Sequence, residues 1–139
     1  MPQFLLDTDH LTLFDQGQAA VCSRLAAQPH NGVGISQVTV EEYLRGRLAH
    51  LAQARDGAAR IHRYGLWHTS IRLFLQVPLV PFHQIAEDEF QQLRGLRLRI
   101  GTQDLKIAAV ALANRLTLVT RNQRDFGKVP GLLLEDWSV

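Results

Sequence analysis

The chain has 139 residues, of which 46% are hydrophobic and 20% are charged. This length suits one compact domain with its own core, and the composition argues against disorder, so we predict a single domain over residues 1–139. No apolar run reaches the roughly 18 residues of a membrane span, and the first residues do not resemble a signal peptide. We therefore expect a cytoplasmic protein with no membrane association. The single cysteine, Cys22, excludes an internal disulfide and is expected in the core.

The distribution of charge is more informative than its sum. The net charge is +2, from 15 basic and 13 acidic residues. If four acids surround a metal ion, the rest of the chain has 15 basic against 9 acidic residues. Thirteen of the basic residues are arginine, whose planar guanidinium donates two hydrogen bonds to one phosphate. This weakly favours a nucleic-acid partner, because arginine also replaces lysine in GC-rich genomes.

Short apolar runs alternate with helical segments along the chain. The expected strands cover residues 4–6, 32–36, 78–81 and 116–120, and residues 132–134 are a candidate fifth. The expected helices cover residues 8–15, 19–27, 38–55, 58–75, 85–97 and 102–114. Thr8 or Asp9 is expected to cap the first helix, and Gly57 is expected to break the longest helical region. The alternation predicts a three-layer α/β/α fold around a mainly parallel sheet of four or five strands.

Four acidic residues fall where the expected strands end or the following helices begin. Asp7 follows the first strand, and Asp125 lies in the loop after the fourth. Glu42 lies in the first turns of the helix after the second strand, and Asp104 lies in the first turn of another helix. Ligands of open parallel sheets bind beyond the carboxyl ends of the strands. We therefore expect these four side chains to meet at one edge of the sheet.

A cluster of carboxylates needs a cation. Two unit charges 4 Å apart repel by about 4 kcal/mol at an effective dielectric constant near 20. Oxygen ligands without His or Cys select Mg²⁺ or Mn²⁺, and such a site is suited to metal-assisted hydrolysis of a phosphodiester. Each acid also has a simpler interpretation. Asp7 could end a strand, Glu42 and Asp104 could complement a helix N-terminus, and Asp125 could be an ordinary loop residue.

Four short motifs resemble those of a known family. They are Leu5-Leu6-Asp7-Thr8-Asp9, the segment from Ser36 to Gly46 with Glu42 four residues before the glycine, the segment Ile100 to Ala109, and the tail from Leu118 through Asp125 to Trp137. In this order they resemble the signatures of PIN-domain nucleases, particularly the VapC-type toxins of bacterial toxin–antitoxin pairs. The resemblance covers essentially the whole chain.

The resemblance implies a PIN-like α/β/α domain that cleaves RNA with Mg²⁺ or Mn²⁺. It also implies a VapB-like antitoxin whose C-terminal segment blocks the site, and a homodimer. Asp7, Glu42 and Asp104 match the family's acidic residues. Asp125 is our prediction for the fourth acid, and Asn122 is its competitor, because many relatives have an aspartate there. Thr120 matches a hydroxyl residue that helps to orient water or the metal shell.

Several neighbouring residues receive secondary roles. Asp9 is either a helix cap or an additional outer-shell group. Arg99, Arg121 and Arg124 are candidate phosphate contacts, although each alone could simply be solvated. The six histidines are expected at surface or core positions without a zinc site, and His10 shows no strong sign of acting as a base.

Two other functions remain open. The absence of an acid at position 122 would suit a PIN module that binds RNA or protein but has lost catalysis. Alternatively, Asp7-Thr8-Asp9 could be the Asp-x-Asp nucleophile motif of a haloacid-dehalogenase-type phosphatase. That chemistry expects a downstream lysine and an acidic pair, and neither Lys106 nor Lys128 precedes such a pair in the usual arrangement.

Overall fold

The computed structural model describes residues 2–139, and over these residues the chain forms five strands and seven helices. The strands are β1 (Phe4–Leu6), β2 (Val33–Ser36), β3 (Leu79–Val80), β4 (Thr117–Val119) and β5 (Leu134–Glu135). The helices are α1 (Thr8–Asp15), α2 (Ala19–Ala26), α3 (Gln37–Ala52), α4 (Gly57–Gln76), α5 (Gln84–Gly95), α6 (Thr102–Ala113) and α7 (Gln123–Phe126).

The strands form one sheet in the order β3-β2-β1-β4-β5, and every neighbouring pair is parallel. The central strand, β1, pairs Leu5 with Gly34 on one side and with Leu118 on the other. Helices connect the strands, as parallel pairing requires. The predicted α/β fold with a parallel sheet is confirmed.

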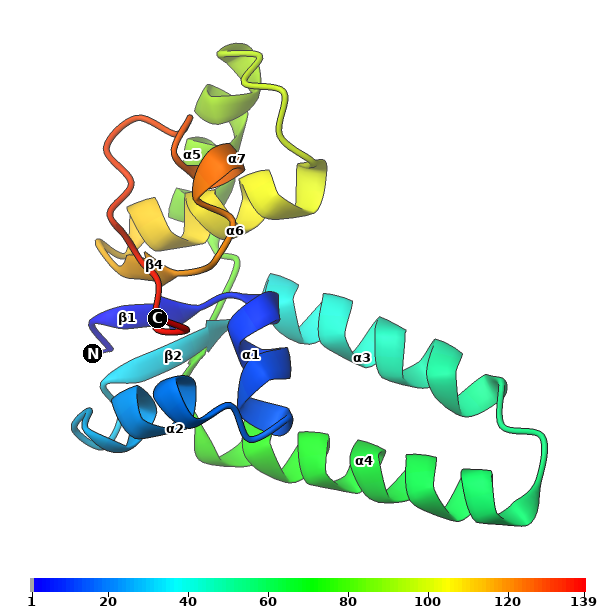
Figure 1. Ribbon diagram of the computed structural model, residues 1–139. Coiled ribbons are helices and arrows are strands. Elements are labelled where there is room, and N and C mark those ends of the chain that lie inside the picture. The colour runs from blue at the N-terminus through cyan, green and yellow to red at the C-terminus, as the bar shows by residue number, and fades with distance from the viewer. Residues whose placement is uncertain (1) are drawn as a thin grey trace.

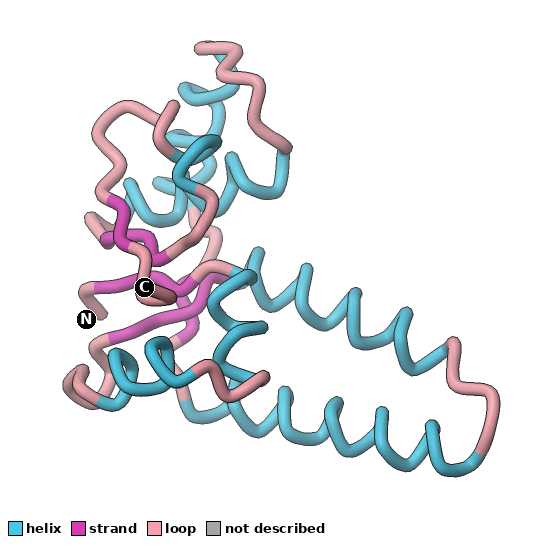
Figure 2. Tube along the Cα trace, in the orientation of Figure 1, coloured by secondary structure: helices cyan, strands magenta, loops and turns pink. Residues whose placement is uncertain are grey.

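Helices cover both faces of the sheet. Figure 1 shows α5, α6 and α7 on one side and α1 and α2 on the other, while α3 and α4 extend away as a long hairpin. Figure 2 shows the short strands enclosed between these helical layers. Side chains of β1 alternate between the layers: Leu5 packs in the core that α5 and α6 cover, whereas Phe4 and Leu6 pack in the core beneath α1 and α2.

The capping residues of two helices differ from those predicted from the sequence. Asp7, rather than Thr8 or Asp9, caps α1, because its Oδ1 accepts a hydrogen bond from Thr8 N at 2.8 Å. Gly57 does not break the helical region but begins α4, which Asp56 caps by accepting from Ala59 N at 2.8 Å. The break lies instead between α3 and Asp56.

Two elements near the C-terminus also differ. The last strand lies at Leu134–Glu135 rather than at residues 132–134, because Leu118 N and Thr120 N donate to Leu133 O and Glu135 O and so set its register. The short helix α7 was not predicted. No helix in residues 2–139 has both the length and the hydropathy needed to cross a membrane.

Candidate acidic site at the carboxyl edge of the sheet

Neighbouring strands bring Asp7 and Thr120 together. Each follows the last residue of its strand, and Leu6 pairs directly with Val119 in the register of β1 and β4. Asp7 N donates to Val119 O at 2.9 Å, which continues the ladder beyond the strands. The Thr120 hydroxyl then donates to Asp7 Oδ2 at 2.8 Å. Both ends of the Asp7 carboxylate are therefore fixed, one by this hydroxyl and one by the start of α1.

The surroundings of Asp7 disfavour the charged form of its carboxyl group. Its side chain is buried, with only 6% of the residue exposed. Burial, followed by the charge of Asp9, raises the pKa of Asp7 from 3.8 to about 7, and the hydrogen bonds from Thr120 and Thr8 only partly offset this rise. The environment of Asp7 therefore disfavours its charged form and moves its titration toward neutral pH.

Glu42 and Asp104 extend the acidic site from two further helices. The Thr8 hydroxyl donates to Glu42 Oε1 at 3.0 Å, which links α1 to the first turns of α3. The pKa of Asp104 is raised, first by burial and then by the charges of Glu42, Asp125 and Asp9. The charge of Asp104 in turn raises the pKa of Asp7. The structure thus groups Asp7, Asp9, Glu42, Asp104 and Asp125 near one another, and we call these five residues the acidic cluster.

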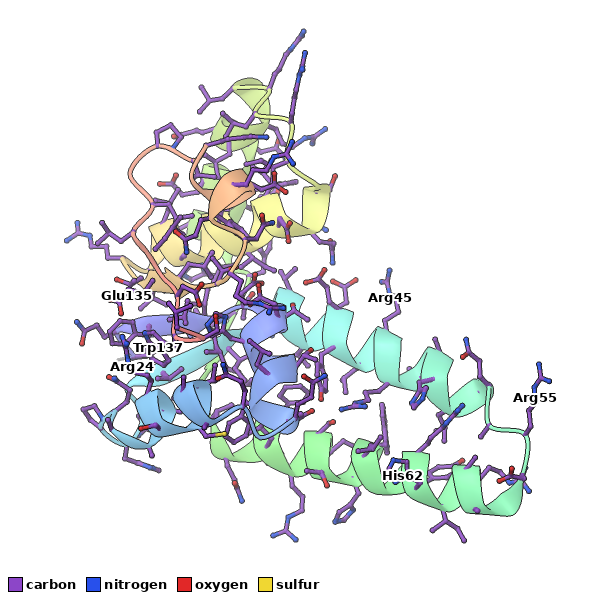
Figure 3. The ribbon with its side chains drawn as sticks, viewed as in Figure 1. Arg24, Arg45, Arg55, His62, Glu135 and Trp137 are labelled. Carbon is purple, nitrogen blue, oxygen red and sulfur yellow. The ribbon has the colours of Figure 1, made fainter. Side chains whose placement is uncertain are left out.

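Glu41, beside Glu42, faces different partners. Its carboxylate accepts from Gln103 Nε2 at 3.0 Å and pairs with Arg45 Nη2 at 2.7 Å. Figure 3 shows Arg45 on the outer side of α3. This is consistent with choosing Glu42 over Glu41 as the acid of this helix. The Gln103 contact also ties α3 to the start of α6, beside Asp104.

Asn122 and Asp125 act together rather than as alternatives. Asn122 caps α7, where its Oδ1 accepts from Asp125 N at 3.3 Å and its Nδ2 donates to Asp125 Oδ2 at 3.2 Å. Asn122 N donates to the Thr120 hydroxyl at 3.0 Å. Lys128 Nζ lies 3.6 Å from Asp125 Oδ1. Asn122 therefore holds Asp125 in place, and only Asp125 contributes a charge.

Asp9 is neither a helix cap nor an isolated acid. It accepts hydrogen bonds from His10 Nδ1 at 2.8 Å and from Arg121 N at 3.0 Å. Burial alone would raise the pKa of Asp9, but the hydrogen bonds from His10 and from Arg121 N, together with the charge of Arg121, lower it. Asp9 is thus a fixed anion beside Asp7. No pattern in the sequence indicates the contact with Arg121 N, because it depends on how α1 packs against the loop after β4.

The arginine candidates lie at the surface of the molecule. Arg99, Arg121 and Arg124 are all exposed. Arg99 has a φ of 59°, and it lies in the loop that leads into α6. Arg121 hydrogen-bonds to the acidic cluster through its main-chain N–H, and its guanidinium acts on Asp9 only through its charge.

A cleft of about 590 Å³ opens beside the acidic cluster. It lies between α1, α3 and α4, and its lining includes Thr8, Glu42, Arg47, His50 and Thr69. Glu42 and Thr8 belong both to this cleft and to the network around Asp7. A substrate or protein segment in the cleft would therefore lie next to the acids.

The arrangement meets some of the requirements of a metal site. All five members of the acidic cluster offer oxygen donors, which suit hard cations. Within the described part of the chain, however, no three His, Cys, Asp or Glu side chains already surround a single ion position. The acidic cluster is therefore a set of nearby carboxylates rather than a preformed metal site.

A three-layer parallel fold with acids at the carboxyl edge of its central strands defines a class of α/β proteins with an acidic site at that edge. Comparison with protein families identifies the class more closely: the PIN domain model matches residues 4–132. The chain belongs to the PIN-domain family, and the resemblance drawn from its four motifs is confirmed. This membership leaves no support for a haloacid-dehalogenase-type phosphatase.

Individual relatives are similar in sequence or in fold. A segment of 41 residues is 50% identical to Ribonuclease VapC2 of Rickettsia felis, covering 30% of this chain and 31% of that relative. Three solved structures share the fold over nearly the whole chain: DNA-bound VapBC from Salmonella typhimurium, FitAcB from Neisseria gonorrhoeae, and a toxin–antitoxin complex from Klebsiella pneumoniae. Their TM-scores are 0.79, 0.73 and 0.70, and their identities are 22%, 24% and 24%. They cover 99%, 98% and 93% of this chain, and the matches span 99%, 99% and 94% of those chains.

Proposed function

We propose that this protein is a cytoplasmic endoribonuclease toxin of the VapC type that hydrolyses RNA phosphodiester bonds with Mg²⁺ or Mn²⁺. The observation that carries the proposal is the grouping of Asp7, Glu42, Asp104 and Asp125 at the carboxyl edge of the sheet, where the charges of Glu42 and Asp125 act on Asp104 and the charge of Asp104 acts on Asp7. Membership of the PIN-domain family supports it, as does the short but 50% identical match to a protein named as a ribonuclease.

The donor chemistry of the acidic cluster fits a divalent cation. Asp7, Asp104 and Asp125, with help from Glu42, would hold the ion. The raised pKa values of Asp7 and Asp104 arise from burial and from neighbouring carboxylate charges, and a cation would oppose both effects. When bound, a divalent ion supplies Lewis acidity toward a phosphoryl oxygen and lowers the pKa of a water ligand.

Other residues of the chain hold the carboxylates of the acidic cluster in position. Thr120 orients Asp7, Thr8 orients Glu42, and Asn122 orients Asp125. Exposed arginines, of which Arg121 and Arg124 flank Asp125 in sequence, would contact RNA phosphates. Binding should then weaken steeply with salt, because each phosphate contact releases condensed counterions.

Cleavage of an end-labelled RNA by the purified protein tests the proposal. We expect cleavage in Mg²⁺, none in EDTA, and a loss of at least about 100-fold in Asp104→Asn. The matched control is Asp88→Asn, which makes the same chemical change at an exposed site on α5. Full activity in Asp104→Asn would refute the site. Metal-independent RNA binding without cleavage would instead favour the module that has lost catalysis.

We propose in addition a VapB-like antitoxin partner and a homodimer. The similar solved structures include VapBC and toxin–antitoxin complexes, which supports an antitoxin. The outer face of α4 carries a run of exposed apolar residues, with Ile61 77%, Tyr64 58% and Leu75 81% exposed. By contrast, Tyr43 and Phe74 pack against each other in the core, with ring centroids 5.7 Å apart.

Light scattering of the purified chain tests the dimer. We expect the mass of two chains in the wild type and of one chain in Ile61→Asp with Leu75→Asp. An exposed polar double variant on α5, Gln91→Asp with Asp88→Ser, should keep the wild-type mass. A monomeric wild type would refute the homodimer and leave the nuclease proposal intact.

A further inference from the structure

The C-terminal segment reaches the acidic cluster through one buried histidine. His10 lies in α1 and is completely buried. Its Nδ1 is 2.8 Å from Asp9 Oδ1, and its Nε2 accepts a hydrogen bond from Trp137 N at 3.0 Å. The imidazole of His10 therefore links Asp9, a member of the acidic cluster, to the main chain of Trp137 near the C-terminus.

The segment that holds His10 is itself firmly packed. Trp137 is completely buried, and its ring meets Phe4 edge-to-face with centroids 5.1 Å apart. Its indole Nε1 donates to Glu135 Oε1 at 3.0 Å, and Arg24 Nη2 lies 3.3 Å from the same oxygen. Figure 3 shows Trp137 and Arg24 close to Glu135, on the body of the protein rather than on the helical hairpin. The position of Trp137 N is thus fixed independently of the acidic cluster.

The hydrogen bond from Trp137 decides which ring nitrogen of His10 carries the proton. A nitrogen that accepts an N–H bond carries no hydrogen in the neutral ring, so the proton must lie on Nδ1. Nδ1 then donates to Asp9. The opposite tautomer would set two N–H groups against each other and leave Asp9 Oδ1 facing an unprotonated nitrogen, with no solvent access at His10.

The two carboxylates beside His10 allow one alternative, in which the imidazole is doubly protonated. Asp9 lies on one side of the ring and Asp136 on the other, with Asp136 Oδ1 3.4 Å from Nε2. A doubly protonated ring would pair with both carboxylates, but it would then oppose Trp137 N. Asp136 Oδ1 is already engaged by Ser138, which donates from its main-chain N at 2.8 Å and from its hydroxyl at 2.6 Å. The shorter contacts favour the neutral ring.

Asp9, held by His10, in turn contacts the loop between β4 and α7. Its second oxygen, Oδ2, accepts from Arg121 N at 3.0 Å and lies 3.4 Å from the Thr120 hydroxyl. The next residue along that loop, Asn122, holds Asp125. A rotation of the Asp9 carboxylate would therefore disturb the loop that places both Thr120 and Asp125.

We propose that His10 is a positioning residue of the acidic site: held in its Nδ1-protonated form by Trp137 N, it fixes Asp9 and through Asp9 the loop from Thr120 to Asp125. The part of this proposal that concerns catalysis rests on the proposed nuclease function. The structural part does not. The C-terminal segment is on this view a component of the site, although it contributes no side chain to the acidic cluster.

Two substitutions separate the two hydrogen bonds of His10. In His10→Asn the amide nitrogen lies near the position of Nδ1 and keeps the donor to Asp9, but the acceptor for Trp137 N is lost. In His10→Gln the amide oxygen can reach the position of Nε2 and keep that acceptor, but the donor to Asp9 is lost. Both changes remove the same ring, so similar losses of thermal stability are expected.

Nuclear magnetic resonance in EDTA tests the structural part without any enzymatic activity. In the wild type we expect imidazole ¹⁵N shifts of a neutral, Nδ1-protonated ring. The Arg121 amide resonance, which reports on Asp9 Oδ2, should move in His10→Gln and stay close to the wild-type position in His10→Asn. A ring protonated on Nε2, or an Arg121 amide that responds equally to both variants, would overturn the proposal. The wild-type measurement is decisive even if a variant fails to fold.

RNA cleavage in Mg²⁺ tests the catalytic part. We expect His10→Gln to lose about 10–100-fold in kcat with KM within about twofold, and His10→Asn to lose less than tenfold. A role limited to stability would make the two losses equal. If the wild type shows the expected ring and amide shifts but cuts no RNA, the proposed function fails while the positioning of Asp9 by His10 stands.

Discussion

The raised pKa of Asp7 makes the unliganded acidic site a source of instability. Folding keeps this carboxyl protonated up to about pH 7, whereas the unfolded chain loses the proton near 3.8. Between these values the folded state binds more protons, so the free energy of unfolding falls as pH rises and levels off above about 7. Replacing Asp7 by the neutral, nearly isosteric asparagine should remove this loss.

The structure gives the expected gain in stability of Asp7→Asn and shows which hydrogen bonds the asparagine can keep. A rise in pKa from 3.8 to about 7 corresponds to roughly 4 kcal/mol at 1.36 kcal/mol per pH unit, and local relaxation should reduce it to about 2–4 kcal/mol. Asparagine Oδ1 can still accept from Thr8 N, and its Nδ2 can donate to the Thr120 hydroxyl, which can then donate toward Asp9. No buried polar group is left without a partner.

Urea unfolding in EDTA at pH 4.5 and at pH 8.5 measures this effect. We expect Asp7→Asn to be at most about 1 kcal/mol more stable than the wild type at the lower pH and about 2–4 kcal/mol more stable at the higher pH. Adding Mg²⁺ should stabilise the wild type and narrow the gap. Asp88→Asn, which changes an exposed acid on α5, should show no comparable gain at either pH. An Asp7→Asn protein that is less stable than the wild type at pH 8.5, or a difference equal at the two values, would refute this account.

Three further predictions concern other parts of the molecule. Thr120→Val should lower RNA cleavage about 10–100-fold while the protein stays folded, because the hydroxyl that orients Asp7 and accepts from Asn122 N is lost; an unchanged rate would contradict this role. Arg121→Ala should leave kcat nearly intact, since only the main chain contacts Asp9, but should reduce the salt slope of RNA binding by about 1, as measured by titration at several salt concentrations. Asp56→Ala should cost about 1 kcal/mol of stability by uncapping α4 and should not change cleavage, so a catalytic defect at constant stability would show that the hairpin takes part in the reaction.

Sequence reasoning placed the main acids well because their positions depend on local signals. Asp7 directly follows a run of buried apolar residues, and Asp104 begins a helix with a long apolar face. Both features can be read from a few adjacent residues. The carboxyl ends of parallel strands then necessarily face the same edge of the sheet. The functional role of these acids stays a prediction until cleavage is measured.

The sequence left open whether Asp9 is a helix cap or an outer-shell group, and whether Asn122 or Asp125 completes the acidic site. Asn122 and Asp125 bond to each other within one turn of α7, a helix of only four residues that carries no periodic pattern. Asp7 takes the cap of α1, which leaves Asp9 free to accept from Arg121 N. Such choices depend on a competition among hydrogen bonds that sequence spacing does not resolve.

The sequence by itself determined the order of strands and helices, the parallel sheet and the edge at which the acids gather, because apolar periodicity and strand direction are properties of contiguous residues. Only the tertiary structure decided how those acids are held. The contact between His10 and Trp137 N joins residues 127 positions apart, and the contact between Thr120 and Asp7 joins residues 113 positions apart. Contacts of this kind exist only after both cores have packed on the sheet, so no local pattern in the chain encodes them.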